Sequence, residues 1–182
     1  MARIILDVDD GRQLVQGLAE SQLVNNHRDR GVLGMPMIDV YAAAGTFADK
    51  HTLAKDLAGA VMRWEQVPDL ALFRNNTAAF VHDLPTGSIS NVAGESNYVR
   101  VQVLTPIGVL DRDKQLGVVK ELTEIVAAAA GDPGLAERTW VLLTESPEGG
   151  WGVAGHANTG ADLAAAARAE IAARAEQQKT SA

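Results

Sequence analysis

Cysteine is absent from this sequence of 182 residues, and aromatic residues make up only 4% of it. The absence of cysteine excludes disulfide bonds, thiolate metal sites and a cysteine nucleophile, and it is typical of proteins from the reducing cytoplasm. No apolar run is long enough to cross a bilayer, and the first residues lack the basic-then-apolar pattern of a signal peptide. We therefore expect a cytoplasmic protein with no membrane partner.

Basic residues are also scarce, since 16 Lys and Arg stand against 23 Asp and Glu and give a net charge of −7. No stretch concentrates positive charge, which argues against a nucleic-acid partner. The four histidines share no metal-ligand spacing, so no metal site is expected. Residues 150–155 match G-x-G-x-x-G, but a dinucleotide site also needs a later strand that ends in an acidic residue, and here only a helix follows. We expect no cofactor.

The sequence does contain one structural unit that occurs twice, over residues 36–97 and 98–157. Each copy predicts a strand, an amphipathic helix, a helix-breaking proline and a second strand followed by a turn. The predicted elements are 37–41, 48–64 and 77–83 in the first copy, and 99–104, 111–129 and 139–145 in the second. The two copies align closely: Gly45 falls on Gly108, a shift of 63 (108 − 45), and Pro68 falls on Pro133, a shift of 65 (133 − 68).

Two βαβ units place two parallel strand pairs in one sheet, and right-handed crossovers put both helices on the same face. We therefore predict an α/β (α+β) fold: a four-stranded mixed sheet with two helices on one face, followed by a C-terminal helix within residues 158–182. The expected apolar stripes of the two helices are Leu53, Leu57, Val61 and Trp64, and Leu116, Val119, Leu122 and Val126. The other face of the sheet is left uncovered, which predicts an oligomer.

The first copy begins at the dipeptide Met35-Pro36. An initiator methionine is removed efficiently when proline follows it, so translation from Met35 leaves Pro36 with a free secondary amine. An α-amino group has a pKa of about 7.7–8.0, and an apolar pocket lowers that value. Such a terminus is a neutral base at working pH. Inside a longer chain the same nitrogen is a tertiary amide with no basicity.

Residues 1–35 have no counterpart in the repeat, and they predict only one helix, over about 12–24. We expect them to be an upstream extension of the reading frame, with the folded domain spanning 36–182. Residues 30–32 favour this interpretation, because Arg-Gly-Val can be encoded by codons that contain a ribosome-binding sequence. The alternative is a genuine extension, which blocks the nitrogen of Pro36.

The Met-Pro start, the strand PMIDVY, the turn at Gly45, the amphipathic helix and the closing segment TESPEGGWGVAG resemble the tautomerase superfamily. The founding member, 4-oxalocrotonate tautomerase, is a single βαβ unit whose strand-closing motif is similar to that of the second copy. The whole chain looks like the fused, two-repeat type similar to cis-3-chloroacrylic acid dehalogenase. The resemblance covers about residues 36–155. It implies a homotrimer with one active site per subunit, because the second-copy position that matches Pro36 is Val99 (36 + 63).

The resemblance implies that Pro36 is the catalytic base and that Trp151 walls the substrate pocket. The substrate-binding arginines of the family are missing at their matched positions, which hold Thr46, Ala78, Val109 or Leu110, and Trp140. A cation for a carboxylate substrate then has to come from elsewhere. We select Arg74, which precedes the strand 77–83, and Arg100, on the polar face of the strand 99–104.

These residues predict an isomerase, a tautomerase that moves a proton between the enol and keto forms of a small unsaturated 2-keto or 2-hydroxy acid. Two alternatives stay open. One is a hydratase, dehalogenase or decarboxylase of the same superfamily with a 3-haloacrylate-type substrate, for which Glu145 and Asp39 are the available water-activating carboxylates. The other is a non-catalytic trimeric relative in which Pro36 is not exposed.

Overall fold

The computed structural model describes residues 34–181, so the helix expected over 12–24 lies outside the described residues. Six strands are described: β1 (Met37–Ala43), β2 (Ala78–Leu84), β3 (Val99–Pro106), β4 (Thr139–Ser146), β5 (Trp151–Val153) and β6 (His156–Asn158). The α-helices are α2 (Lys50–Glu65), α3 (Ala71–Asn76), α4 (Arg112–Ala130) and α5 (Gly160–Ser181), and a 3-10 helix, η1, spans Pro133–Arg138. All three elements predicted in each repeat are present. Their observed ends differ from the predicted ends by no more than two residues.

The first four strands form one mixed sheet in the order β2-β1-β3-β4. β1 runs parallel to β2 and β3 runs parallel to β4, while β1 and β3 are antiparallel neighbours in the centre. This is the arrangement expected of two βαβ units that join edge to edge. The predicted fold class is therefore confirmed, and β5 and β6 form a separate small hairpin.

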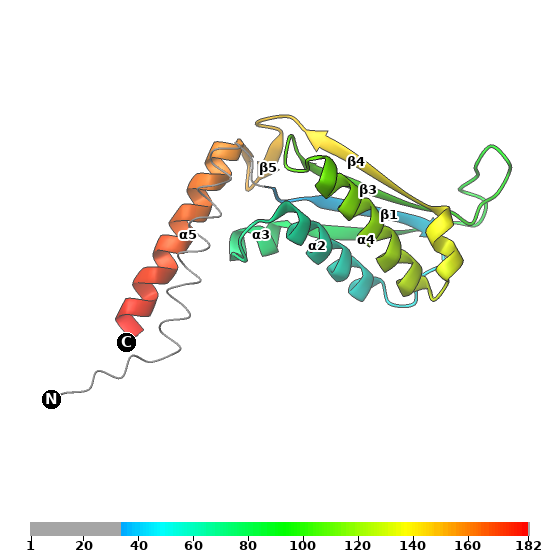
Figure 1. The fold of residues 1–182 in the computed structure, drawn as a ribbon, viewed down its shortest axis with the longest axis horizontal. Coiled ribbons are helices and arrows are strands. Elements are labelled where there is room, and N and C mark those ends of the chain that lie inside the picture. Colours follow the sequence, from blue (N-terminus) through cyan, green and yellow to red (C-terminus); the bar gives the residue numbers. More distant parts are fainter. Residues whose placement is uncertain (1–33, 182) are drawn as a thin grey trace.

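Helices α2 and α4 cover one face of the sheet, as Figure 1 shows. Each helix begins at an aspartate whose carboxylate accepts a backbone N–H three residues later, Asp49 from Thr52 and Asp111 from Lys114. The main core lies between these helices and the inward side chains of the two central strands, which include Ile38, Val40, Val101 and Val103. Alternate residues of β1 and β3 are buried, so the pleat of each strand sets which side chains reach the core.

The two helices pack closely at Gly117 of α4. A β-carbon added at Gly117 would lie only 2.1 Å from the ring of Trp64, which leaves room for glycine alone. The indole Nε1 of Trp64, in α2, donates a hydrogen bond of 2.6 Å to Glu121 of α4. Trp64 thus packs between the helices, as a partly buried residue at the edge of the core.

One predicted stripe is wrong in half of its residues, since Leu122 and Val126 are buried as predicted and the other two are not. Leu116 and Val119 were expected to face the sheet, but they are 54% and 36% exposed. The buried residues of α4 are instead Val118, Leu122, Val126 and Ala127. On a helix with 3.6 residues per turn, positions 118, 122 and 126 form the buried stripe. Gly117 flanks this stripe on the side of α2, and positions 116 and 119 lie on its other flank, toward solvent.

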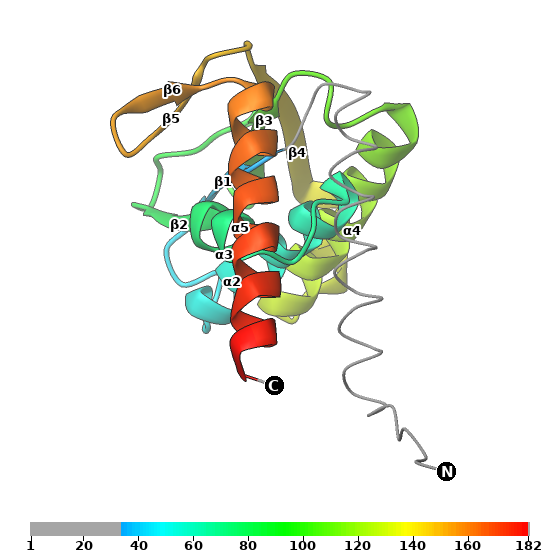
Figure 2. The same ribbon diagram turned by 90° about the vertical axis from the view of Figure 1, so that its left-hand side faces the viewer.

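Helix α3 was not predicted, and it is held by the C-terminal helix. Leu70, at the N-cap of α3, supplies no side-chain hydrogen bond. Instead the carboxylate of Glu170 in α5 accepts the N–H groups of Ala71 and Leu72 at 2.8 and 2.9 Å. Figure 2 looks along the molecule from this end, with α5 in front of α3 and the sheet. The predicted C-terminal helix is confirmed, and it crosses one end of the sheet.

The sheet face away from α2 and α4 carries large exposed side chains, among them Phe80, Leu104, Trp140 and Leu142. Polar and aromatic residues lie between them: the His82 ring stacks on Tyr41, and the Arg100 guanidinium lies over the Tyr41 ring at 5.2 Å. The expectation of an uncovered face therefore holds for the described chain. None of the helices within residues 34–181 has the length and apolar character that a membrane span requires.

Candidate active site

Pro36 lies directly before β1, one of the two central strands of the sheet. Its carbonyl oxygen accepts the Ala78 N–H at 3.3 Å, which continues the parallel pairing with β2. On the other side Met37 pairs with Leu104, so Pro36 stands opposite Thr105 of β3, one step further along the register. Pro36 is buried, and in this chain its nitrogen is acylated by Met35. The first strand therefore presents this proline at one end of the sheet, beside residues of both neighbouring strands, β2 and β3.

Met35 is fully buried in a second apolar cluster, which we call the Met35 cluster. It contains Met35, Leu70, Phe73, Trp151, Leu163, Ala164 and Ala167. These residues come from the segment before β1, from α3 and its N-cap, from β5 and from α5. Trp151, predicted to wall the substrate pocket, is therefore brought to the residue that precedes Pro36. The cluster is apolar, as a pocket that lowers the pKa of an amine needs to be.

Trp151 contributes one polar group to this cluster. The side chain is only 6% exposed, and its Nε1 is buried. Among the residues that the structure describes, no acceptor lies within hydrogen-bond reach of this N–H. A buried donor of this kind is available for an oxygen atom of a bound molecule.

A buried acid, Glu65, lies close to Pro36. It is the last residue of α2 and is 0% exposed. Its Oε1 accepts a hydrogen bond of 2.5 Å from the hydroxyl of Thr105, the residue opposite Pro36. Its carboxylate also lies against Gly34, where an added β-carbon would stand 2.2 Å from Oε2. Burial raises the pKa of the Glu65 carboxyl to about 8, against the opposing effects of the Thr105 hydroxyl and the Lys114 charge.

The two arginines selected from the sequence lie in different places. Arg74 belongs to α3, next to Phe73 of the Met35 cluster, but its exposed guanidinium pairs with Asp69 at 3.1 Å. Arg100 pairs in register with Tyr41, five residues along β1 from Pro36. At about 3.3 Å per residue this is roughly 16 Å away. Within one chain, Arg74 shares an end of the sheet with Pro36 and Arg100 does not.

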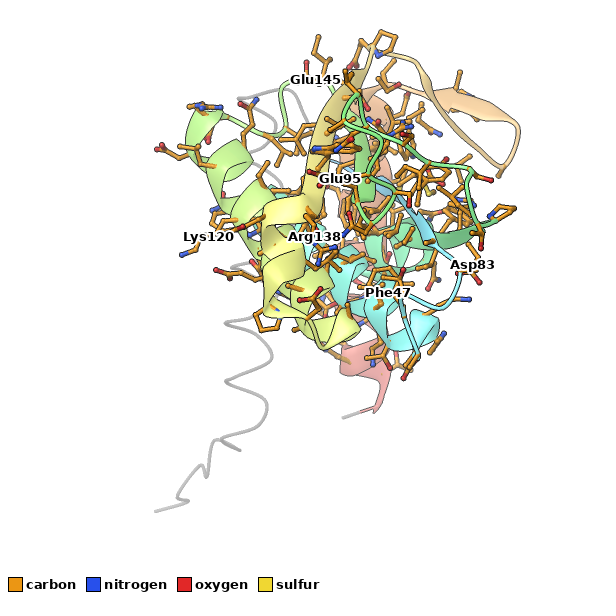
Figure 3. All side chains as sticks on the ribbon, turned by 90° about the vertical axis from the view of Figure 1, so that its right-hand side faces the viewer. Phe47, Asp83, Glu95, Lys120, Arg138 and Glu145 are labelled. Carbon is orange, nitrogen blue, oxygen red and sulfur yellow. The ribbon has the colours of Figure 1, made fainter. Side chains whose placement is uncertain are left out.

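The carboxylates considered for water activation already have partners. Asp39 Oδ1 lies 2.6 Å from His82 Nε2, on the uncovered face of the sheet. Glu145 lies at the end of β4 (Figure 3), where its Oε1 accepts the Gly108 N–H at 2.9 Å. Asp39 is thus engaged on the opposite face from Glu65. Glu145 pairs in register with Thr105, so it stands one strand further from Pro36 than Thr105 does, and its carboxylate is held by Gly108. Among residues 34–181, no three His, Asp or Glu side chains gather as a metal site.

The sequence contains a signal for Glu65, although the predicted apolar stripe of this helix does not include it. Leu53, Leu57 and Val61 are four residues apart, and the next position in that series is 65. A charged residue on the buried stripe of a helix is costly unless something holds it. Thr105 and Lys114, two of the described residues that interact with Glu65, belong to the second repeat, so no local pattern links them to it.

No protein-family model matches the sequence, and no curated protein matches it. Solved structures do share its fold. A fused 4-OT wild-type symmetric trimer is 22% identical, with a TM-score of 0.57 over 71% of this chain and 98% of the other. Pt0534, inactivated by 2-oxo-3-pentynoate, is 19% identical, with a TM-score of 0.58 over 70% and 98%.

A third structure, N1, is a member of the cis-3-chloroacrylic acid dehalogenase family. It is 19% identical, with a TM-score of 0.54 over 65% of this chain and 80% of the other. At these identities the likeness concerns the fold. The expectation drawn from the sequence is confirmed at that level: the chain has the fold of the tautomerase superfamily in its fused, two-repeat form.

Proposed function

We propose that the protein is a tautomerase whose general base is the amine of Pro36, exposed when the chain starts there. The observation that carries this proposal is the position of Pro36. It begins the central strand of a tautomerase-type sheet, it is buried, and the residue before it is a methionine inside an apolar cluster. The division into an extension over 1–35 and a catalytic domain over 36–182 is part of the same proposal.

The surroundings of Pro36 favour a neutral amine. An α-amino group has an ordinary pKa of about 7.7–8.0, and apolar neighbours disfavour its charged form. The Met35 cluster, which includes Phe73, Trp151 and Leu163, adjoins the position of the Pro36 nitrogen through Met35. A neutral secondary amine can take the proton of an enol or of a carbon next to a carbonyl, which is the step that keto–enol exchange requires.

The substrate class we propose is a small unsaturated 2-keto or 2-hydroxy acid. The buried Nε1 of Trp151 is placed to donate to a substrate oxygen, and Arg74 lies on the helix that lines the same cluster. The apolar cluster favours a substrate with an apolar tail over one with a second carboxylate. One solved structure with this fold was inactivated by a 2-keto acid, 2-oxo-3-pentynoate, which supports this class.

We also propose a homotrimer. The uncovered face of the sheet carries exposed apolar side chains, including Phe80 at 50%, Trp140 at 40% and Leu142 at 45%. A face of this kind is typical of an interface between subunits. Several of the structures with this fold are described as trimers. In such an assembly Arg100, which is remote from Pro36 within its own chain, is available to the site of a neighbouring copy.

Expression from Met35 tests the proposal. Intact mass should identify a chain of 147 residues (182 − 36 + 1) that begins at Pro36. This chain keeps every described strand and helix. We expect it to accelerate the ketonisation of phenylenolpyruvate, and both Pro36→Ala and a chain retaining residues 1–35 should lose at least about 100-fold in kcat/KM. Equal activity in the Pro36→Ala variant would exclude Pro36 as the base.

A second candidate is a hydrolytic dehalogenase for 3-haloacrylates. The fold is shared with a member of the cis-3-chloroacrylic acid dehalogenase family, and Glu65 supplies a buried carboxyl beside Pro36. Halide release from 3-chloroacrylate, measured with the same 147-residue chain, separates the two activities. A chain that starts at Pro36 and is inactive in both assays would instead be the non-catalytic relative.

A further inference from the structure

Pro36 and Glu65 face the same space although they come from different elements. The inward residues of β1 are 38, 40 and 42, and those of β3 are 99, 101, 103 and 105. Pro36 and Thr105 therefore lie opposite each other on the helix-covered face. Side chains in such cross-strand pairs are about 5 Å apart. The Thr105 hydroxyl binds Glu65 at 2.5 Å, which places the carboxyl within about 9 Å of the proline ring.

The residues just before Pro36 also lie close to the Glu65 carboxyl. The nitrogen of Pro36 is bonded to Met35, and the residue before that, Gly34, lies against Glu65. In a chain that starts at Pro36, neither of these residues separates the amine from the acid. The two groups then share one buried space, with the Met35 cluster on one side and Thr105 on the other.

A buried amine and a buried carboxyl have a preferred distribution of protons. A neutral amine beside a neutral carboxyl avoids the cost of burying two charges, which is several kcal/mol for each ion. Among the residues that the structure describes, Lys114 of α4 is a charged group whose field reaches Glu65 from another element, and burial keeps the pKa of the acid raised to about 8 in the full chain despite it. The pair can thus hold one proton on the carboxyl and leave the amine free as a base.

We propose that Glu65 is a catalytic proton donor that works together with Pro36, an inference that rests on the proposed tautomerase function. In ketonisation, the nitrogen of Pro36 takes the proton of the 2-hydroxyl group as the C2–O bond becomes a carbonyl. The electron pair of the C2–C3 double bond takes the proton of the Glu65 carboxyl at C3. The cationic amine then returns one proton to the carboxylate, directly or through a water molecule. No proton is gained or lost over the cycle.

The first test is the pH dependence of the unmodified protein, isolated from its host and shown by intact mass to begin at Pro36. We expect kcat to fall at alkaline pH, because Glu65 then loses the proton that it must donate, and burial among the remaining residues still raises its pKa above the ordinary value. Alkylation of Pro36 by 2-oxo-3-pentynoate should not fall over that range, because the amine stays neutral. The chain has no cysteine to compete for this reagent. A kcat that stays level from neutral to alkaline pH overturns the inference.

The second test compares two Glu→Gln variants made in the complete gene. Glu65→Gln keeps the size of the side chain and an oxygen for Thr105, but it has no acidic proton. We expect its kcat to fall about 10²–10⁴-fold, while Pro36 is still alkylated. The matched control is Glu121→Gln, at a partly buried glutamate that binds Arg63 and Trp64 and should keep the parent kcat.

The outcomes separate this inference from the function on which it rests. A kcat of Glu65→Gln within threefold of the parent overturns the role of Glu65 and leaves Pro36 as the base. If Glu65→Gln does not fold, the pH profile of the unmodified protein decides. A parent protein that neither turns over the enol nor is alkylated at Pro36 contradicts the proposed function itself.

Discussion

At the scale of single residues, Glu65 couples stability to pH. Its ordinary pKa of 4.5 is raised by burial to about 8 in the folded chain. Between these two values the folded protein holds a proton that the unfolded chain has released. The folded state then binds more protons than the unfolded state, so the free energy of unfolding falls as the pH rises from about 4.5 to about 8.

Replacing Glu65 with glutamine should remove this dependence, because the amide does not titrate. We expect the free energy of unfolding of Glu65→Gln, relative to the parent, to rise with pH by up to about 1.4 kcal/mol per unit over that window. Urea unfolding of both proteins at several pH values measures the difference. A difference that stays constant with pH would show that the carboxyl is not protonated in the folded chain.

At the scale of secondary structure, the contact between α2 and α4 depends on a glycine. Gly117→Ala should raise helix propensity by up to about 1 kcal/mol, yet the new β-carbon meets the Trp64 ring at 2.1 Å. Overpacking of this kind typically costs about 1–3 kcal/mol. We therefore expect a net loss of stability in urea unfolding.

Gly59 in α2 offers the matched control. A β-carbon there meets only the end of the Arg63 side chain at 3.5 Å, an ordinary contact. Gly59→Ala should therefore stabilise the protein by up to about 1 kcal/mol. Equal effects of the two substitutions would contradict the packing of Trp64 on Gly117.

The link between α3 and α5 is a second test at this scale. Although burial raises it, the pKa of Glu170 is held below its usual value by the N–H groups of Leu72 and Ala71 and by the Arg174 guanidinium. Glu170→Ala should remove the cap of α3 and cost about 0.5–2 kcal/mol. The loss should shrink at low pH, where the parent carboxylate is protonated as well. Glu176→Ala, whose exposed carboxylate meets Lys179 at 3.5 Å, should change stability by less than about 0.5 kcal/mol.

The elements differ in how far the sequence could predict them. The strands and the two long helices follow from periodicity and from prolines that align between the copies, so their positions were predictable. Helix α3 has only six residues, and its cap comes from Glu170, 99 residues from Ala71. Such a non-local bond leaves no local pattern. Pro36 and Trp151 were proposed as site residues by resemblance. The approach of Glu65 to Pro36 depends on the β1–β3 register, which sets Thr105 opposite Pro36, and on the tertiary contact between Glu65 and Thr105.

At the scale of the whole molecule, the uncovered sheet face should join the subunits. Leu142 on this face is 45% exposed, and Leu116 on the outer side of α4 is 54% exposed. We expect sedimentation equilibrium to give the mass of a trimer for the parent. Leu142→Asp should shift it toward the monomer, because it buries a charge in the interface, and Leu116→Asp should not. Dissociation by both variants, or by neither, would contradict this face as the interface.

The whole account depends on a free secondary amine at the start of β1, within a site where the Met35 cluster and Glu65 meet. Sequencing the N-terminus of the protein isolated from its native host tests this most directly. The account predicts that the protein begins Pro-Met-Ile-Asp, the residues from position 36 onward. A protein that begins Met-Ala-Arg or Ala-Arg-Ile would carry an acylated proline, and the proposed base would not exist.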